Sequence, residues 1–238
     1  MKIIPTTLLF SFLFLLVSCK EEEKKKPKVN YDSKVTTQET IDEAANAILV
    51  ADLPVQMEGT SVLLHPIGEF TVVGGKSKYS SSGKESYRVS NYGEYEITGY
   101  LNNLKFQEVG SDSLKVLTDK PMMIERITYL KSFADKTKKQ FLVYVLVDMD
   151  SNKDGKLDNN DIKDLYISSI TGDGFIKLSP EFQELIDWNV IESQNRLYFR
   201  TIEDSNKNGA FDSEDKVHYQ YLNLISKEVK VEEYYPVN

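Results

Sequence analysis

The sequence predicts a mainly β protein of antiparallel sheets in a β-propeller-like arrangement, with about three to four blades in a closed ring or an open stack. Three observations support this. Apolar residues alternate with a period of two along much of the chain. A four-strand pattern recurs after 54 residues, between Asp150 and Asp204. Clusters rich in Asp, Asn and Gly separate the expected strands. Four antiparallel strands at a period of about 50 residues are the unit of a propeller blade.

The first eighteen residues have the composition of a removable signal peptide. Met1-Lys2 is a short basic region, and Ile3 to Val17 is apolar but short for a membrane-spanning helix. The segment ends in Leu16-Val17-Ser18-Cys19, which resembles the lipobox of bacterial lipoproteins. We therefore expect residues 1–18 to be a lipoprotein signal peptide and Cys19 to be lipidated. The alternative is an ordinary signal peptide, or an anchor, beside an incidental cysteine.

Residues 19–34 are expected to form a charged tether between the lipid and the domain. Lys20 to Lys28 contains no apolar side chain and cannot contribute to a core. The acidic cluster after Cys19 resembles the surface-export signal of Bacteroidota lipoproteins, although a plain spacer would look the same. The expected location is the outer membrane, on its periplasmic face or at the cell surface.

Composition limits the partners of the remaining chain. Without residues 1–18, which hold one Lys, 28 basic and 37 acidic side chains leave a net charge of −9. This charge argues against nucleic acid and anionic lipid as partners. No later segment is apolar for long enough to cross a bilayer, so the membrane contact is expected through Cys19 alone. A single cysteine also excludes an intramolecular disulfide and a thiolate metal cluster. Residues 35–238 suit one domain.

One short N-terminal helix is expected between Thr36 and Asp52. Thr37 can cap it, Glu39 to Leu49 would form its body, and Pro54 lies beyond its end.

Two internal repeats, residues 122–180 and 183–236, carry the strongest signal. Both contain the sequence Asp-Ser-Asn-Lys at the start of a polar loop, and the flanks of both loops alternate with the period of a strand. An EF-hand would have helices there, so each loop is expected inside a β-hairpin. The predicted strands are Met123–Leu130, Phe141–Asp148, Lys163–Ile170 and Gly174–Leu178, followed by Leu185–Ile191, Arg196–Glu203, Lys216–Ile225 and Glu228–Tyr235. The end of a third unit is visible upstream, at Leu104–Val109 and Leu114–Thr118.

The segment Leu165 to Pro180, which contains Thr171-Gly172-Asp173-Gly174 followed by Leu178-Ser179-Pro180, resembles the blade repeats of TolB-like propellers. Residues 98–235 as a whole resemble uncharacterised Bacteroidota lipoproteins in which such blades carry Asp- and Asn-rich loops similar to EF-hand and dockerin loops. The resemblance implies a fold and a location but no activity. Three blades are fewer than the usual four to eight. Either residues 54–100 supply the missing strands, or the sheets form an open stack.

Each polar loop has the spacing of a twelve-residue calcium loop. Oxygen-bearing side chains fall at positions 1, 3, 5, 9 and 12, Gly falls at position 6, and position 7 offers its backbone carbonyl. The alternative is a pair of Asx-rich turns, which use the same residue types but do not require this spacing twice. Two Ca²⁺ ions are therefore predicted, with these ligands: Asp150, Asn152, Asp154, Lys156, Asp158 and Asp161 in the first loop, and Asp204, Asn206, Asn208, Ala210, Asp212 and Asp215 in the second.

The calcium sites are expected to stabilise the fold rather than to signal. Regulatory EF-hands open a pair of helices, and strand flanks provide none. The first loop offers four carboxylates and the second three, so the first is expected to bind more tightly.

Catalytic motifs are absent from the sequence. It has no Gly-x-Ser-x-Gly, His-Glu-x-x-His or phosphate-loop pattern, and neither His65 nor His218 has a motif partner. The leading hypothesis is a non-enzymatic binding or scaffold module with an unidentified protein or glycan ligand. The alternative is a hydrolase, or its accessory subunit, acting on envelope or extracellular glycans or peptides. A pocket with two or more acids outside the calcium loops and near tyrosines would favour this alternative. Trp188 could stack on a sugar, although such aromatic residues more often serve strand packing.

Overall fold

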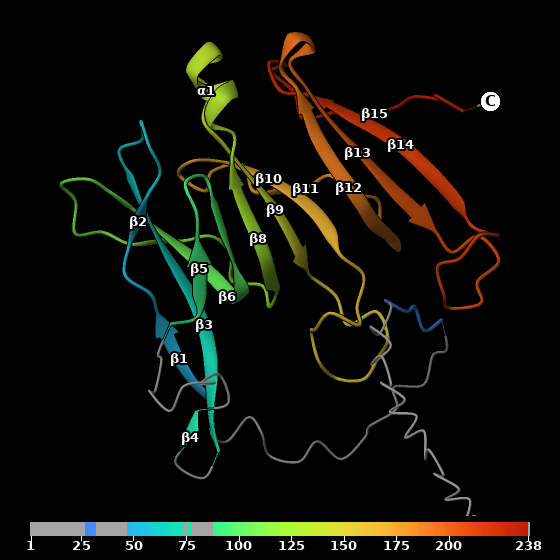
Figure 1. Cartoon of the computed structure of the whole chain (residues 1–238), viewed down its shortest axis with the longest axis horizontal. Helices are drawn as coiled ribbons and strands as arrows, with labels where there is room; N and C mark the ends of the chain where they lie inside the picture. Colours follow the sequence, from blue (N-terminus) through green and yellow to red (C-terminus); the bar gives the residue numbers. More distant parts are fainter. Residues whose placement is uncertain (1–26, 32–46, 74–75, 78–87, 238) are drawn as a thin grey trace, which may run out of the picture.

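The computed structural model describes residues 27–31, 47–73, 76–77 and 88–237, and in these residues strands dominate (Figure 1). All strand pairs are antiparallel. An eleven-stranded sheet holds β1 to β11, and a separate four-stranded sheet holds β12 to β15. The elements are β1 (Ala47–Ala51), β2 (Val55–Gln56), β3 (Val62–Val73), β4 (Lys76–Ser77), β5 (Ser90–Tyr92), β6 (Glu96–Glu108), β7 (Lys115–Val116), β8 (Met123–Tyr129), α1 (Lys131–Thr137), β9 (Phe141–Val147), β10 (Asp164–Ser169), β11 (Ile176–Lys177), β12 (Gln183–Ile191), β13 (Arg196–Glu203), β14 (Lys216–Asn223) and β15 (Val231–Glu233).

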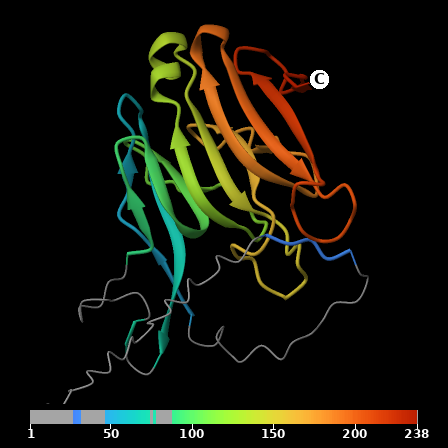
Figure 2. The same cartoon turned by 45° about the vertical axis from the view of Figure 1, so that its right-hand side comes forward.

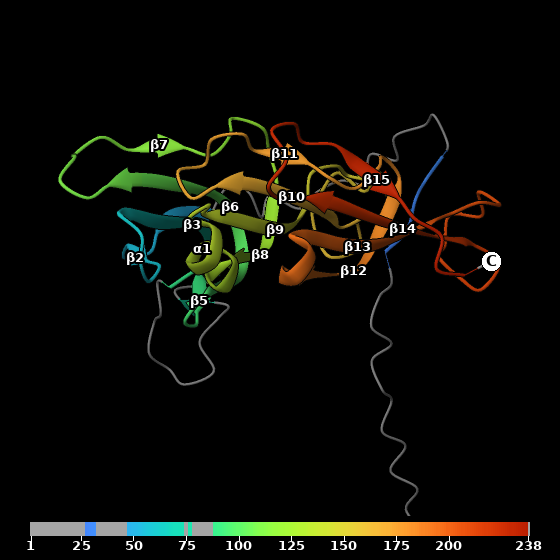
Figure 3. The same ribbon diagram turned by 90° about the horizontal axis from the view of Figure 1, so that it is seen from above.

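Twelve of the fifteen strands form three four-stranded units that follow one another along the molecule (Figure 3). The other three, β1, β4 and β5, pair with β3 or β6. The first unit is β2-β3-β6-β7, the second is β8-β9-β10-β11, and the third is β12-β13-β14-β15. The long strand β6 joins the first two units, because its first half pairs with β8 and its second half with β3 and β7. The eight strands predicted for the two repeats are confirmed: Arg196–Glu203 has the predicted bounds, and the other seven differ by a few residues at their ends.

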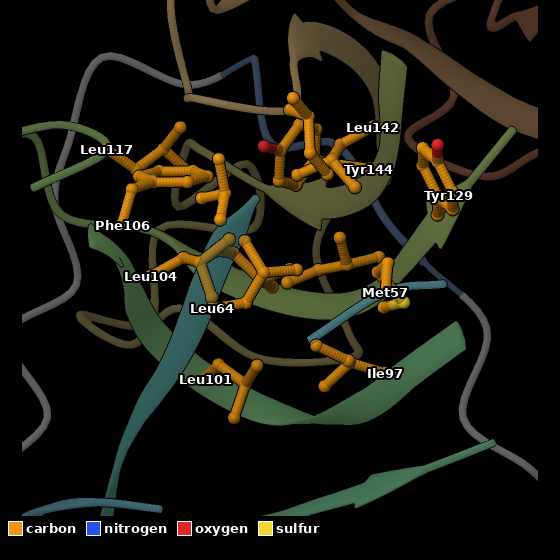
Figure 4. Close-up of a cluster of buried hydrophobic side chains, with 14 of the residues drawn as sticks. Met57, Leu64, Ile97, Leu101, Leu104, Phe106, Leu117, Tyr129, Leu142 and Tyr144 are labelled. Carbon is orange, nitrogen blue, oxygen red and sulfur yellow. The ribbon is translucent and has the colours of Figure 1, made fainter. Parts of the chain in front are cut away.

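The second unit is buried on both faces. Leu142 and Tyr144 of β9 belong to a core shared with the first unit (Figure 4). Val143, between them, faces a second core together with Leu197 and Phe199 of the third unit. Successive side chains of a strand point to opposite faces, so one strand serves two cores. The predicted antiparallel, mainly β architecture is therefore confirmed, while no ring of blades closes within the described part of the chain.

The predicted N-terminal helix is wrong where the structure describes it. Ala47–Ala51 form β1 and pair with β3, in register from Ala47 opposite Thr71 to Ala51 opposite Ile67. The β-branched Ile48 and Val50 suit a strand, and pairing with the edge of β3 overrides the weak helix signals of this segment. The rest of the expected helix, residues 37–46, lies outside the described residues.

A helix forms instead at α1, in the connection between β8 and β9. Its seven residues bury Phe133 and Ala134, and it ends at Lys138 with a left-handed backbone (φ +63°). No helix in the described segments is long and apolar enough to cross a bilayer. The predicted signal peptide and the predicted lipidation site, Cys19, lie outside the described residues.

Candidate metal centres

The two polar loops occupy equivalent places in neighbouring units. The first loop, Asp150–Asp161, connects β9 to β10, and the second loop, Asp204–Asp215, connects β13 to β14. Both connections join antiparallel partners, so the predicted strand flanks are confirmed. The loops emerge at the same end of the molecule, away from α1 (Figure 1).

The early positions of the first loop hold their side-chain oxygens on backbone N–H groups. Asp150 accepts from the N–H of Asp154 at 3.1 Å and of Gly155 at 2.8 Å. Asn152 Oδ1 accepts from the same Asp154 N–H at 2.8 Å. Asp154 Oδ1 accepts from the N–H of Lys156 at 3.0 Å. These bonds wind the backbone around the side chains of positions 1, 3 and 5.

The late positions close the first loop onto its start. Asp161, whose side chain is fully buried, accepts from the N–H of Ser151 at 2.9 Å and of Asn152 at 3.2 Å through Oδ1. Its other oxygen accepts from the N–H of Asp158 at 3.0 Å. Burial raises the pKa of the Asp161 carboxyl, and the charge of Asp150 acts in the same direction, while backbone donors oppose them.

The second loop repeats this hydrogen-bond set 54 residues later. The corresponding bonds run from Asn208 N–H and Gly209 N–H to Asp204, from Asn208 N–H to Asn206, from Ala210 N–H to Asn208, from Glu214 N–H to Asp212, and from Ser205 and Asp212 N–H to Asp215, at 2.7–3.1 Å. In the first loop, Asp158 likewise accepts from Asn160 N–H at 2.7 Å. The sequence repeat is therefore a repeat of geometry as well.

Both loops use a left-handed backbone at the same two positions. Position 4 is Lys153 or Lys207, with φ of +60° and +57°, and position 6 is Gly155 or Gly209, with φ of +84° and +82°. Glycine at position 6 adopts this conformation without a steric penalty.

The donor set suits a hard cation. In the described part of the chain, no three acidic, histidine or cysteine side chains are grouped closely enough to hold a metal ion. The loop carboxylates accept hydrogen bonds from neutral backbone N–H groups. Carboxylate, amide and carbonyl oxygens are the ligands that Ca²⁺ prefers, and these are the oxygens that each loop brings together.

The two loops differ in how deeply they lie. Asp161 and Ser151 of the first loop are buried, whereas Ser205 of the second loop is exposed and Asp215 is half-buried. The loop with more carboxylates is therefore also the one packed more closely against the fold.

A short N-terminal segment, Pro27–Tyr31, ties the two loops together (Figure 2). Lys28 N–H donates to Asn160 O at 3.0 Å and Asn30 N–H donates to Ser151 O at 2.9 Å, both in the first loop. Val29 N–H donates to Gly209 O of the second loop at 3.1 Å, and the Val29 side chain is buried. These residues belong to the segment predicted to be a tether, and their contact with the loops was not predicted. The signal available was Val29, the first apolar residue after the charged run.

A group of charged side chains lies in and beside the strands next to each loop, and the sequence did not predict it. In the second unit, Lys177 Nζ lies 2.9 Å from Asp164 and 3.2 Å from Asp148. Burial and the hydrogen bond with Asp148 raise the pKa of Asp164. In the third unit His218, the repeat equivalent of Asp164, bonds to Glu203 at 2.8 Å and to Glu233 at 3.4 Å. At both places a side chain that follows the loop in the sequence therefore contacts acidic side chains of the same unit.

The remaining predicted residues are placed as follows. Lys156 and Ala210 each donate the backbone N–H to the side-chain oxygen at position 5. Ala210 also forms an isolated antiparallel bridge with Lys28, and the ligand role of both carbonyl oxygens stays a prediction. His65 bonds to Gln107 at 2.9 Å on the first unit. The chain matches no protein-family model and has no significant match among curated proteins or solved structures.

Proposed function

We propose that this protein is a calcium-binding lipoprotein of the bacterial outer envelope, anchored through Cys19, in which two structural Ca²⁺ sites support a binding or scaffold module. The observation that supports this most is the duplicated hydrogen-bond set of the two loops. A simple turn needs only one or two such bonds. Here five side chains per loop accept hydrogen bonds from equivalent backbone N–H groups.

In this proposal the chain's own residues prepare the sites. The backbone N–H groups hold Asp150, Asn152 and Asp154 on one side of the loop, and the buried Asp161 closes it on the other. Calcium supplies the positive charge that offsets the repulsion among these carboxylates. Because Pro27–Tyr31 contacts both loops, fixing them also fixes the point where the tether reaches the domain.

Calorimetry tests the calcium proposal. The expected result is uptake of two Ca²⁺ per chain and a higher melting temperature in calcium than in EGTA. A site with Kd of about 10 µM adds about 2.7 kcal/mol to the free energy of unfolding at about 1 mM Ca²⁺. Asp161→Asn and Asp215→Asn should each remove one site, while Asp119→Asn, at an exposed position outside the loops, should remove none. Absence of binding heat, together with equal melting temperatures in calcium and EGTA, would refute the proposal.

Anchoring has a separate test. Cells expressing the full chain are grown with an alkyne-bearing fatty acid, and label is followed into the protein. Label that enters the wild type and is lost in Cys19→Ser supports lipidation, and a wild type that stays unlabelled contradicts it.

A further inference from the structure

A cleft of about 510 Å³ opens between the second and third units. Its size lies within the range of pockets that hold small ligands. Its lining includes no residue of either loop, although Lys163 follows the first loop by two residues. On the side of the second unit it is lined by β8, β9 and Lys163, and on the side of the third unit by β12. Its lining residues are Glu125, Arg126, Val145, Lys163, Glu184, Leu185, Ile186, Asp187 and Trp188.

Two β-bulges face this cleft. The register of β8 shifts between Ile124 and Arg126, which makes Glu125 an extra residue. The register of β12 shifts between Leu185 and Asp187, which makes Ile186 extra. Bulges bend a strand and re-aim its side chains, and they are frequent beside binding sites. Both walls are therefore distorted at the place where they line the same cavity.

The charges in the cleft largely compensate one another. Lys163 Nζ lies 2.5 Å from Glu125 Oε2, and the Lys163 N–H donates to Glu184 Oε2 at 2.6 Å. Asp187 pairs with Arg200, and Arg126 Nη1 lies 3.4 Å from Glu96. A cavity whose charges are already paired gives little net attraction to an ionic ligand. It still offers many hydrogen-bond donors and acceptors.

Glu184 can both donate and accept at neutral pH. Burial raises the pKa of its carboxyl to about 7, and the neighbouring Glu125 acts in the same direction, against the backbone bond and charge of Lys163. A half-protonated carboxyl matches a ligand hydroxyl, which is itself donor and acceptor.

Trp188 adds an aromatic wall. It is half-buried against the second core and lines the cleft beside Leu185 and Ile186. An indole ring offers a flat apolar face and one N–H donor. A ligand that presents apolar C–H faces as well as several hydroxyls would use both kinds of wall.

We propose that the cleft between β8 and β12 binds a neutral saccharide, stacked on Trp188 and hydrogen-bonded by Glu125, Glu184 and Lys163. This inference names the ligand of the binding module proposed above, and it rests on that part of the proposal. It does not depend on the calcium sites for its chemistry.

The chain provides its own probe, because Trp188 is its single tryptophan. The purified ectodomain, in 1 mM Ca²⁺, is titrated with cellohexaose, maltohexaose, laminarihexaose and N-acetylchitohexaose while Trp188 emission and acrylamide quenching are followed. At least one saccharide should change the emission and lower the quenching constant at least twofold. If all four leave both signals unchanged up to 10 mM, the inference is overturned.

Variants identify the site. Glu184→Ala and Glu125→Gln should each weaken binding at least tenfold, and Glu108→Gln, at an exposed position outside the cleft, should not change it. Trp188→Phe, followed by calorimetry, should weaken binding to a similar degree. Equal affinity in all variants would mean that the saccharide binds elsewhere, and the inference would fail.

Three further measurements separate the outcomes. Calcium calorimetry on the same variants should give unchanged heats, so lost saccharide binding with intact calcium binding bears on the cleft alone. Spermidine and a lysine-rich peptide are titrated in parallel, and binding of these cations in place of saccharides would overturn the choice of ligand. Chromatography of the incubated saccharides should show no shorter products, since the inference is one of binding.

Discussion

Val29 and Gly209 are in direct backbone contact. The Val29 N–H donates to the Gly209 carbonyl at 3.1 Å, and the Val29 carbonyl oxygen lies 2.6 Å from the place where a Cβ of residue 209 would sit. The N-terminal segment thus rests on a loop position that has no side chain. This contact links the segment Pro27–Tyr31 to the second loop, Asp204–Asp215.

Gly209→Ala should release the segment. The added methyl group collides with the Val29 carbonyl, so amide exchange at Lys28–Asn30 should become at least tenfold faster. Gly155→Ala is the matched control, because Gly155 has nearly the same φ and open space at its Cβ position. Both variants should lose about 1 kcal/mol of folding stability, because alanine is strained in the left-handed backbone conformation. Equal exchange rates in the two variants would show that the contact does not hold the segment.

Position 5 is Asp154 in the first loop and Asn208 in the second, so the loops differ there by one negative charge. Substitution can exchange the two residue types. Asn208→Asp should tighten calcium binding by the second loop, and Asp154→Asn should weaken binding by the first, each by about tenfold, or about 1.4 kcal/mol. Both substitutions keep the side-chain oxygen that accepts the N–H of position 7. Calorimetric titration measures the two affinities. Unchanged affinities would contradict the ligand role of position 5.

Val143→Thr should destabilise the fold by about 1–3 kcal/mol, because it buries a hydroxyl at almost constant volume. Val143 is 1% exposed between the second and third units. Val145→Thr, two residues further along the same face and only partly buried, should cost less. Urea denaturation measures both. A larger loss at Val145 would argue against the packing described for the second core.

Glu184→Gln should change the pH dependence of stability. The pKa of Glu184 is about 7 in the fold, against an ordinary value of 4.5. Between these values the folded state holds more protons than the unfolded state, so the free energy of unfolding falls as pH rises, by at most about 3 kcal/mol. The charges facing Glu184 are those of Lys163, Glu125, Arg126 and Asp187.

The Glu184→Gln variant should lack this decrease in the free energy of unfolding. Its stability relative to the wild type should therefore rise from pH 4.5 to pH 8. Glu108→Gln is the control, with no change expected. Thermal melts across that range measure the effect, and parallel curves for Glu184→Gln and the wild type would refute the assignment.

The repeats explain how much of the fold could be predicted. β8 to β15 could be placed within a few residues, because the same alternation of apolar residues occurs twice and each copy supports the other. The helix α1 was missed, since seven residues give barely two turns and Leu130 before it offers no side-chain cap. The segment Ala47–Ala51 was misassigned, because its partner β3 lies about twenty residues away and only the fold brings the two together.

The loops could be predicted as chemical patterns but their surroundings could not. The spacing indicates which side chains between Asp150 and Asp161 act together in the first loop. The hydrogen bonds accepted by these side chains agree with that spacing. The contact of Val29 with Gly209 joins residues 180 positions apart, and no local pattern encodes it. The cleft between β8 and β12 is equally non-local: Glu125 and Glu184 each look like an ordinary strand acid until two units pack together.

The position of the second unit between two cores has a consequence for unfolding. Repeat architectures can melt piece by piece when each repeat contacts its neighbours weakly. Here β9 contributes alternate side chains to both cores, so unfolding of either outer unit would expose one face of the second unit to water. The three units should therefore denature together, in a single calorimetric transition whose van't Hoff and measured enthalpies agree.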